Sequence, residues 1–354
     1  MKTIKIGLIG AGGNTRTRHI PGFKAIRNIE LSAVANRSME SSKKIAAEFG
    51  VREVAANWRQ IIENPDIDAV CIGTWPYMHC PITIAALENH KHVLCEARMA
   101  LNANEAHKML DVSRKNPDLI AQIVPAPHTL AIDQTIIELI GSGFIGDLIS
   151  MDGRINSGSD FTMSKSPPHW RHNKDLSGNN IMNMGIWYEA IMRWLGDMTG
   201  VFALGKTTIS HRLDAEKRRI PMPIPDHIDI LGHFAQGGQM RLTVSTVIGL
   251  SPTEVDLFIF GTKGTLRVLQ KKDADIELFA GDKNASQLER IMIEPDKKGK
   301  WRVEEEFVNA IRGIEEITHT DFTTGAKYME WTDAVTISMQ TRELVPLPLS
   351  NGMR

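Results

Sequence analysis

The chain has little of what marks a membrane-spanning, secreted or nucleic-acid-binding protein. No segment approaches the roughly 18 uninterrupted apolar residues that a membrane-spanning helix needs, and the apolar stretch at residues 4–9 meets glycine too early for a signal peptide. Its 41 basic and 42 acidic residues are interspersed and leave a net charge of −1. We therefore expect no nucleic-acid partner and no membrane partner.

Cysteine is scarce as well. Cys71, Cys80 and Cys95 are odd in number and lie in segments that are predicted as a buried strand, the start of a helix and another strand. Structural disulfides are therefore not expected, and a cytoplasmic location follows. No second ligand pair accompanies His79, Cys80 and Cys95 at the spacing of a zinc site, so we predict no metal and interpret the cysteines as small buried hydrophobic residues.

The chain has no internal repeat and no low-complexity tract, and its 354 residues suggest two domains. Residues 1–126 alternate short apolar runs with helix-length amphipathic segments, a pattern typical of a doubly wound parallel sheet of the Rossmann type. The predicted strands are 4–9, 29–35, 69–74, 92–96 and 119–124. The predicted helices are 17–26, 41–49, 80–88 and 103–113.

Beyond Pro125 and Pro127 the pattern changes to longer alternating strands. We assign residues 127–354 to a second, α+β domain with an open, mainly antiparallel sheet. Its predicted strands are 148–156, 201–210, 228–234, 240–248, 255–260, 265–269 and 276–279. Its predicted helices are 132–140, 180–195, 304–311 and 326–339.

A glycine turn follows the first predicted strand and reads Gly10, Ala11, Gly12, Gly13, Asn14 and Thr15. Gly10 permits the tight bend, and Gly12 lets a pyrophosphate approach the backbone at a helix N-terminus. Thr15 stands where a third glycine or alanine is usual, so the motif gains its weight from its position between a strand and a helix. The turn predicts a bound nicotinamide dinucleotide.

The acidic residue that would bond the ribose 2'-hydroxyl of NAD is missing, because the second predicted strand is followed by Asn36, Arg37 and Ser38. Asn36 would not repel a 2'-phosphate, and Arg37 and Ser38 could contact it. This favours NADP over NAD. Arg37 could instead stack on the adenine, which either cofactor allows.

Many short motifs in register resemble the Gfo/Idh/MocA family, named after glucose-fructose oxidoreductase, inositol dehydrogenase and MocA. They are residues 10–21 including His19-Ile20-Pro21, 66–70, Thr74 with His79, 85–87, 91–96, 105–106, 143–146, and Ser177-Gly178 with Gly185. The resemblance spans the chain. It implies a substrate-binding and oligomerisation role for the second domain and a homodimer or homotetramer. It also implies cofactor contacts from Thr74, Trp75, His79, Glu96 and Ala97.

The family resemblance also implies an activity on hydroxyl groups of sugars, inositols and related polyols, but the acid-base residues of the family are absent. Its Glu-Lys-Pro motif reads Glu96-Ala97-Arg98 here, and its Asp-x-Gly-x-His motif runs from Asn183 to Trp187. Removing hydride from an alcohol carbon leaves a hydroxyl proton, and a positioned acceptor for it is worth about 10²- to 10⁴-fold in rate. Ala97, Asn183 and Trp187 cannot accept this proton.

Three residues are candidates for the missing acceptor. His128 stands where the family has an arginine, and it titrates near neutrality. His169 lies in a donor-rich loop, and Tyr188 lies beside the helix face that Asn183 and Trp187 share and that we expect to face the substrate. Core packing explains Tyr188 as well as catalysis does.

The loop at residues 167–172 contains His169, Trp170, Arg171 and His172. With Arg98 and Arg154 it could form an electropositive pocket for a carboxylate, phosphate or sulfonate on a sugar-like substrate. A solvated loop whose Trp170 covers the core explains the same residues equally well.

These observations favour an NAD(P)-dependent oxidoreductase that acts on a hydroxyl or carbonyl of a sugar, sugar acid or polyol. The first alternative is redox-neutral glycoside cleavage, in which transient oxidation of the sugar permits elimination and bound NAD is regenerated, as in relatives of the family that lack the motif lysine. The second is a nucleotide-binding regulator without catalysis. Arg98, His128 and Trp187 argue against the regulator, because they keep chemical character where small apolar residues would suffice.

Overall fold

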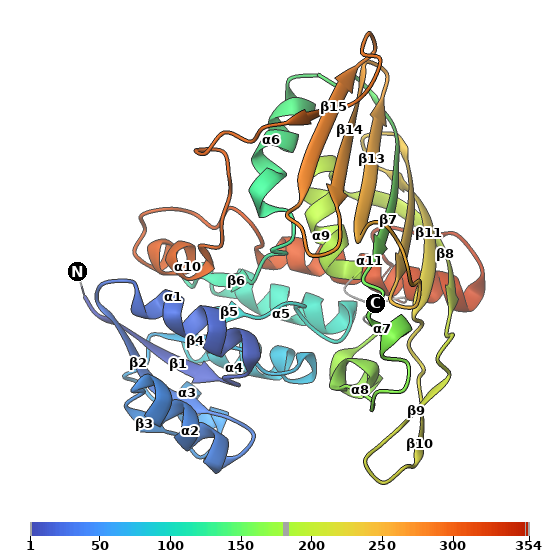
Figure 1. Cartoon of the computed structure of the whole chain (residues 1–354). Coiled ribbons are helices and arrows are strands. Elements are labelled where there is room, and N and C mark those ends of the chain that lie inside the picture. The colour runs from blue at the N-terminus through green and yellow to red at the C-terminus, as the bar shows by residue number, and fades with distance from the viewer. Residues whose placement is uncertain (1, 180–183, 351, 353–354) are drawn as a thin grey trace. The chain divides into compact units, whose positions relative to one another are not determined.

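The computed structural model describes residues 2–179, 184–350 and 352. The chain divides into two compact units, one of Met1–Pro125 with Arg302–Met329 and the other of Ala126–Trp301 with Glu330–Arg354 (Figure 1). Residues 302–329 thus group with the first unit by their contacts, and the domain bounds of 1–126 and 127–354 stay a prediction. They join the first unit because α10 (Val303–Ile311) packs on α1 (Ile20–Lys24).

The first unit is built on a parallel sheet whose strands are ordered β3-β2-β1-β4-β5-β6. The strands are β1 (Ile4–Ile9), β2 (Ile29–Ala35), β3 (Glu53–Val54), β4 (Ala69–Ile72), β5 (His92–Cys95) and β6 (Ala121–Ile123). This is the strand order of a dinucleotide-binding Rossmann fold, so the predicted fold class is confirmed. The strands β2 and β3 lie on one side of β1, and β4, β5 and β6 lie on its other side. The carboxyl ends of β1 and β4 therefore form the switch point at which such sheets bind ligands.

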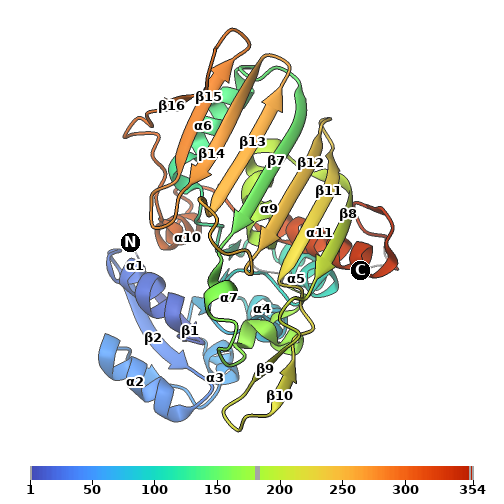
Figure 2. The ribbon, with the colours of Figure 1, turned by 45° about the vertical axis from the view of Figure 1, so that its right-hand side comes forward.

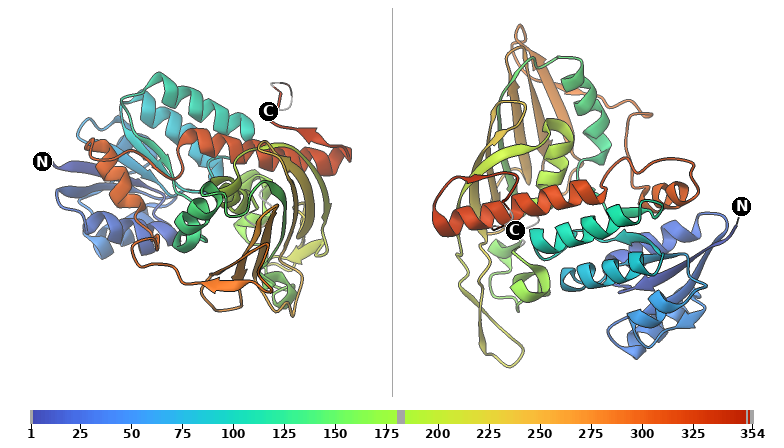
Figure 3. Two further views of the ribbon diagram at one scale, coloured as in Figure 1. Left: turned by 90° about the horizontal axis from the view of Figure 1, so that it is seen from above. Right: turned by 180° about the vertical axis from the view of Figure 1, so that it is seen from behind.

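The connecting helices are α1, α2 (Met39–Phe49), α3 (Trp58–Glu63), α4 (His79–Glu88) and α5 (Ala103–Lys115), with the helical turns η1 (Thr15–His19) and η2 (Pro76–Met78). Helices α4 and α5 lie side by side (Figure 3). The sequence analysis missed β3 and α3, because a two-residue strand and a six-residue helix show too little periodicity. The first predicted helix begins earlier than expected, in η1.

The second unit is built on a sheet ordered β16-β15-β14-β13-β7-β12-β11-β8-β17 (Figure 2). Its strands are β7 (Leu148–Asn156), β8 (Met198–Lys206), β11 (His227–Phe234), β12 (Gln239–Ser245), β13 (Val255–Gly261), β14 (Gly264–Gln270), β15 (Glu277–Asp282), β16 (Glu289–Ile291) and β17 (Val345–Pro346). A separate hairpin pairs β9 (His211–Leu213) with β10 (Arg219–Pro221). The prediction of an open, mainly antiparallel sheet is confirmed. The pair of β7 and β12 is the parallel one among the pairs of this sheet that the structure describes.

Helices cover one face of this sheet. They are α6 (Leu130–Gly141), α9 (Met184–Leu195) and the part of α11 (Phe322–Thr341) that belongs to the second unit, while α7 (Ser159–Thr162), η3 (Trp170–His172) and α8 (Lys174–Ser177) are short. Figures 2 and 3 show α6 and α9 on the same side of the sheet. Among the described residues, no helix is both long and apolar enough to cross a membrane.

A buried histidine joins three parts of the first unit. The Nδ1 atom of His19 lies 2.5 Å from Glu304 of α10, and its Nε2 atom lies 2.9 Å from Glu96, which follows β5. Burial alone would lower the pKa of His19, but the bonds to both carboxylates outweigh it and raise the pKa to about 9. His19 is therefore a cation at neutral pH. Gly22 leaves room for this contact, because a Cβ atom there would lie 2.5 Å from an oxygen of Glu304.

We expect the free energy of unfolding to fall as the pH rises past neutrality. The folded-state pKa of about 9 exceeds the ordinary 6.5 of histidine, so protonated His19 stabilises the fold fully below the lower value and not above the higher. The difference between the two pKa values corresponds to about 3 kcal/mol in the free energy of unfolding. Chemical denaturation at about pH 6 and about pH 10 measures this loss, with His19→Gln to subtract the titration of other groups. Equal pH dependence in both proteins would show that His19 is not charged in the native state.

Candidate cofactor and substrate sites

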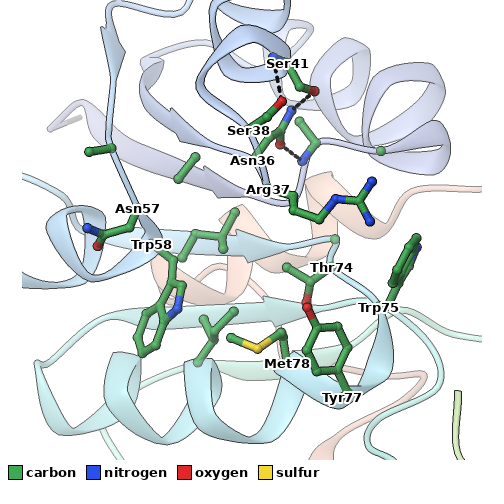
Figure 4. Close-up of a pocket in the computed structure, with 18 residues that line it drawn as sticks. Asn36, Arg37, Ser38, Ser41, Asn57, Trp58, Thr74, Trp75, Tyr77 and Met78 are labelled. Atoms are coloured by element: carbon green, nitrogen blue, oxygen red, sulfur yellow. Dashed lines mark hydrogen bonds between the residues drawn. The ribbon is translucent and has the colours of Figure 1, made fainter. Parts of the chain in front are cut away.

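A cavity of about 450 Å³ lies at the carboxyl ends of β1, β2 and β4 in the first unit (Figure 4). It brings together a part of the predicted cofactor residues, namely Gly10, Gly12, Asn36, Arg37, Ser38, Thr74 and Trp75. Asn57, Trp58, Tyr77 and Met78 also line it and were not predicted. Asn57 and Trp58 were missed because they begin α3, which the sequence pattern did not reveal.

The glycine turn has the geometry that a dinucleotide requires. Gly10 has a φ of +81°, and a Cβ atom there would lie 2.6 Å from the backbone nitrogen of Thr74, so only glycine fits. Gly12 and Gly13 are exposed, and no atom lies within 4 Å of a Cβ atom built on Gly13. A ligand can therefore approach this backbone closely, and the residues present fit a bound dinucleotide.

The side chains after β2 are fixed by hydrogen bonds. The amide oxygen of Asn36 accepts from the Ala11 nitrogen at 2.7 Å, and its amide nitrogen donates to the Ser41 hydroxyl at 2.9 Å (Figure 4). The Ser38 hydroxyl caps α2 by accepting from the Ser41 nitrogen at 3.2 Å. Arg37 is the charged side chain of this cavity's lining, and its guanidinium lies 5.2 Å from the centre of the Trp75 ring.

Other predicted cofactor residues brace the turn outside the cavity lining. The side chain of Asn14 donates to Glu96, which also accepts from the Ala97 nitrogen at 3.0 Å. Buried Thr15 donates from its hydroxyl to the Gly10 carbonyl at 3.5 Å. Contact of Gly13, Asn14, Thr15, Glu96 and Ala97 with the cofactor stays a prediction.

His79 links the ends of two strands. It is buried, with Nδ1 lying 2.9 Å from the Arg98 carbonyl and Nε2 lying 2.9 Å from the Thr74 carbonyl. Burial lowers the pKa of His79. A neutral imidazole carries a single N–H and donates to only one of the two carbonyls. The close contact of the ring with Thr74 positions this residue, which lines the cofactor cavity.

A second cavity, of about 710 Å³, lies in the second unit. It brings together predicted catalytic and substrate-binding residues, namely His128, His169, Arg171, His172 and Trp187. Its wall also contains the carboxyl-end residues Asn156 of β7 and Ser245 of β12.

His128 stacks on Trp187, with ring centres 4.8 Å apart and ring planes at 11°. Burial lowers the pKa of His128, the charge of Arg193 lowers it further, and Glu189 opposes both. The neutral imidazole that results can accept a proton. Glu189 and Arg193 hold the chain near His128, because Glu189 accepts from the Ala126 nitrogen at 2.8 Å and Arg193 donates to the Ala126 carbonyl at 2.7 Å.

The two histidines of the loop at residues 167–172 accept hydrogen bonds from backbone nitrogens of the same loop. The Nδ1 atom of His172 accepts from the His169 nitrogen at 3.0 Å, and the Nδ1 atom of His169 accepts from the Arg171 nitrogen at 3.3 Å. Burial lowers the pKa of both, with further lowering by Arg171 for His169 and by Arg212 for His172. Both rings therefore stay neutral at physiological pH.

Tyr188 is placed in the core and not in the cavity. Its hydroxyl accepts from the Met198 nitrogen at 3.0 Å, and its ring stacks on Trp331 with centres 4.4 Å apart. Burial raises the pKa of Tyr188 above its ordinary range. The contacts favour the packing interpretation of this residue.

The remaining predicted substrate residues do not line the second cavity. Arg98 is buried in the first unit, and Arg154 is exposed on the open face of the second sheet. Trp170 lines a neighbouring cavity that shares His169 and His172 with the larger one. Asn183 lies outside the described residues.

Three carboxylates line the second cavity and were not predicted, because no motif marks them. They are Asp160, Asp226 and Glu254. Asp226 accepts from the backbone nitrogens of Thr208 and Ile209 at 2.8 and 2.7 Å. Arg171 lines the cavity together with these three carboxylates, and an electropositive pocket that includes Arg98 and Arg154 stays a prediction. Among the described residues, no group of three or more metal-type ligands comes together.

Comparison with known proteins gives consistent matches for both units. The family model "Oxidoreductase family, NAD-binding Rossmann fold" of Gfo/Idh/MocA proteins matches residues 4–122, and the "GFO/IDH/MocA C-terminal domain" matches residues 134–267. Levoglucosan dehydrogenase of Pseudarthrobacter phenanthrenivorans is 26% identical over 309 residues, which cover 80% of this chain and 78% of that protein.

Two further proteins extend the comparison. A dTDP-3,4-didehydro-2,6-dideoxy-alpha-D-glucose 3-reductase of Streptomyces antibioticus is 23% identical, covering 87% of this chain and 93% of its own. The solved structure of a levoglucosan dehydrogenase in complex with NADH and L-sorbose has a TM-score of 0.85 at 22% identity and covers 98% of this chain and 99% of that one. This similarity shows a shared fold.

Proposed function

Since the chain belongs to the Gfo/Idh/MocA family of NAD-binding oxidoreductases, we propose that it transfers hydride between a nicotinamide cofactor and a hydroxyl or carbonyl carbon of a sugar, sugar acid or polyol. The observation that carries the proposal is the neutral His128, stacked on Trp187 in the wall of a polar cavity. The levoglucosan dehydrogenase and the dTDP-sugar reductase that resemble this chain support a carbohydrate substrate.

His128 supplies the proton acceptor that the missing lysine would have provided. When an alcohol is oxidised, the carbon loses a hydride and the hydroxyl loses a proton, and both must be accepted. A bound nicotinamide supplies the hydride exchange. The imidazole of His128 accepts the proton in oxidation, and its protonated form returns one in reduction.

We propose a neutral polyhydroxylated substrate in preference to an anionic one. Asp226 and Glu254 line the cavity, and carboxylates accept hydrogen bonds from hydroxyl groups but repel anions. Arg171 is the cation among the cavity's described lining. An anionic substrate would have to be held by this exposed side chain against the nearby carboxylates.

Turnover tests the proposal directly. The assay follows nicotinamide absorbance with NAD⁺ and with NADP⁺ in the presence of levoglucosan, D-glucose, L-sorbose, myo-inositol or D-glucuronate. L-sorbose has a carbonyl group and is also tested with NADH and with NADPH. We expect a net change with a neutral sugar or polyol. His128→Gln should lower kcat by about 10²- to 10⁴-fold with a smaller effect on KM. Tyr188→Phe is the matched control, because its hydroxyl lies outside the cavity and kcat should be kept.

Two outcomes would contradict the proposal. Cleavage of a glycoside that requires bound cofactor, gives no net reduced nicotinamide and brings solvent deuterium into the sugar would establish the redox-neutral alternative. Tight cofactor binding without any turnover, together with a protein partner, would establish the regulator.

For the cofactor, NAD(H) fits the family, and we propose a preference for NADP. No carboxylate occurs among the described residues that line the nucleotide cavity, so nothing there repels a 2'-phosphate. Arg37 is the one cationic side chain in that lining, and a guanidinium forms strong paired hydrogen bonds with phosphate. The neighbours solved with NADH support binding of the unphosphorylated cofactor as well.

The substitution Arg37→Gln should weaken NADPH binding by about 10- to 100-fold and leave NADH binding nearly unchanged, because only the 2'-phosphate loses a charged partner. Fluorescence titration of both reduced cofactors measures this. Arg59→Gln is the control, since that guanidinium stacks on Trp58 and does not line the cavity. Equal weakening of both cofactors would show that Arg37 stacks on adenine instead.

We also propose a cytoplasmic homodimer or homotetramer that pairs through the open sheet face. One row of cross-strand neighbours on this face runs from Phe202 through Leu231, Arg241, Asp152, Phe258 and Arg267 to Phe279. Leu204 and Leu231 are 56% and 50% exposed there, which is unusual for a sheet that stays unpaired. The free, buried thiols support the cytoplasmic location.

Light scattering should therefore give the mass of two or four chains. Leu231→Glu places a charge in the middle of the row and should shift the protein toward smaller species by at least about tenfold in dissociation constant. Leu250→Glu is the control, because Leu250 is exposed in a loop outside this sheet. A monomeric native protein would overturn the proposal.

A further inference from the structure

Much of the second cavity's wall is formed by one irregular segment, residues 157–172. This segment contains only α7 and η3, and nine of its residues line the cavity, among them Asp160, Met163, Ser166 and His172. Short helices satisfy few of their own backbone carbonyls. The segment therefore needs side-chain partners from elsewhere to keep one shape.

Arg212 is such a partner. Its Nη1 atom donates to the Met163 carbonyl at 2.9 Å, to the Ser166 carbonyl at 3.1 Å and to the Ser166 hydroxyl at 2.7 Å, with a longer contact of 3.4 Å to the Ser164 carbonyl. Its Nη2 atom donates to the Asp160 carboxylate. One guanidinium thus holds together the stretch from Asp160 to Ser166.

The same contacts tie the segment to the sheet. The other oxygen of Asp160 accepts from the Thr246 hydroxyl at 2.6 Å, and the Thr246 carbonyl accepts from the Asp160 nitrogen at 2.9 Å. Thr246 follows β12 and lines the cavity. Arg212, Asp160 and Thr246 therefore form a chain of contacts from the separate hairpin to the large sheet.

Arg212 itself stays outside the cavity. It belongs to β9 of the hairpin, is 3% exposed and is not part of the cavity lining. Burial and the charge of Arg212 together lower the pKa of His172, which does line the cavity. Arg212 can therefore act on a ligand only through the residues that it holds.

We propose that Arg212 is a positioning residue that fixes the substrate-binding wall at residues 157–172 without touching the substrate. The geometry requires arginine, because a planar guanidinium reaches a carboxylate, a hydroxyl and several carbonyls at once, whereas the lysine ammonium has three donors at a single point. The structural part of this proposal stands on the contacts alone. Its kinetic part rests on the proposed function.

Hydrogen exchange followed by mass spectrometry tests the structural part. Arg212→Ala should speed exchange of the amides at residues 160–166 by at least about tenfold, while those of β7 and β12 change little. Arg212→Lys should lie between the native protein and Arg212→Ala. Arg218→Ala is the matched control, because Arg218 lies on the same hairpin, is 71% exposed and contacts Asp214 and Glu216. Unchanged exchange at 160–166, or equally faster exchange throughout the second unit, would overturn the proposal.

Steady-state kinetics with levoglucosan and L-sorbose as probes test the kinetic part of the proposal. Arg212→Lys should raise KM by about tenfold or more and change kcat by less than about threefold, because the wall is displaced while His128 remains. NADPH affinity should not change, since the nucleotide cavity belongs to the other unit. A fall in kcat with KM unchanged would contradict the positioning role. If neither sugar is turned over, the proposed function fails for these probes, and the exchange experiment still decides the role of Arg212.

Discussion

The first unit depends on a positive charge buried between two carboxylates. His19 is fully buried, and an isolated charge there would be expelled or neutralised. Glu96 and Glu304 make the cation stable, and His19 in turn lowers the pKa of Glu96 despite the burial that would raise it. Because Glu96 also holds Asn14 of the glycine turn, and Glu304 belongs to α10, this cation connects the nucleotide-binding turn to residues far along the chain.

Histidine serves opposite purposes in the two units, and the neighbours decide which. His19 has two carboxylates as partners and stays charged. Partial desolvation and nearby guanidinium groups lower the pKa of His128, His169 and His172, so each stays neutral. A neutral ring can take up a substrate proton, whereas the His19 cation is already fully engaged. Under the proposed function, His128 is such a ring and takes the place of the family's lysine as the proton acceptor.

Much of the fold follows from local sequence patterns. The bounds of β1, β2 and β7 match the prediction, because six to nine alternating or continuously apolar residues give a clear signal. The strands β3, β9 and β10 have two or three residues and give none. Tyr188 could not be assigned from its helical position, since nearly every residue of α9 is buried and no single face is distinguished. The contact between Asp160 and Arg212 joins residues 52 positions apart, and only the tertiary fold reveals it.

The two cavities are built in physically different ways, and under the proposed function this separates cofactor binding from substrate choice. The nucleotide cavity lies at strand ends, beside a turn whose backbone only glycine permits. The second cavity takes much of its wall from an irregular segment that Arg212 holds from a separate hairpin. Substitutions within residues 157–172 can therefore change the shape and polarity of that wall while the Rossmann sheet and its glycine turn remain as they are. A protein built in this way can acquire a new substrate without rebuilding the unit that binds its cofactor.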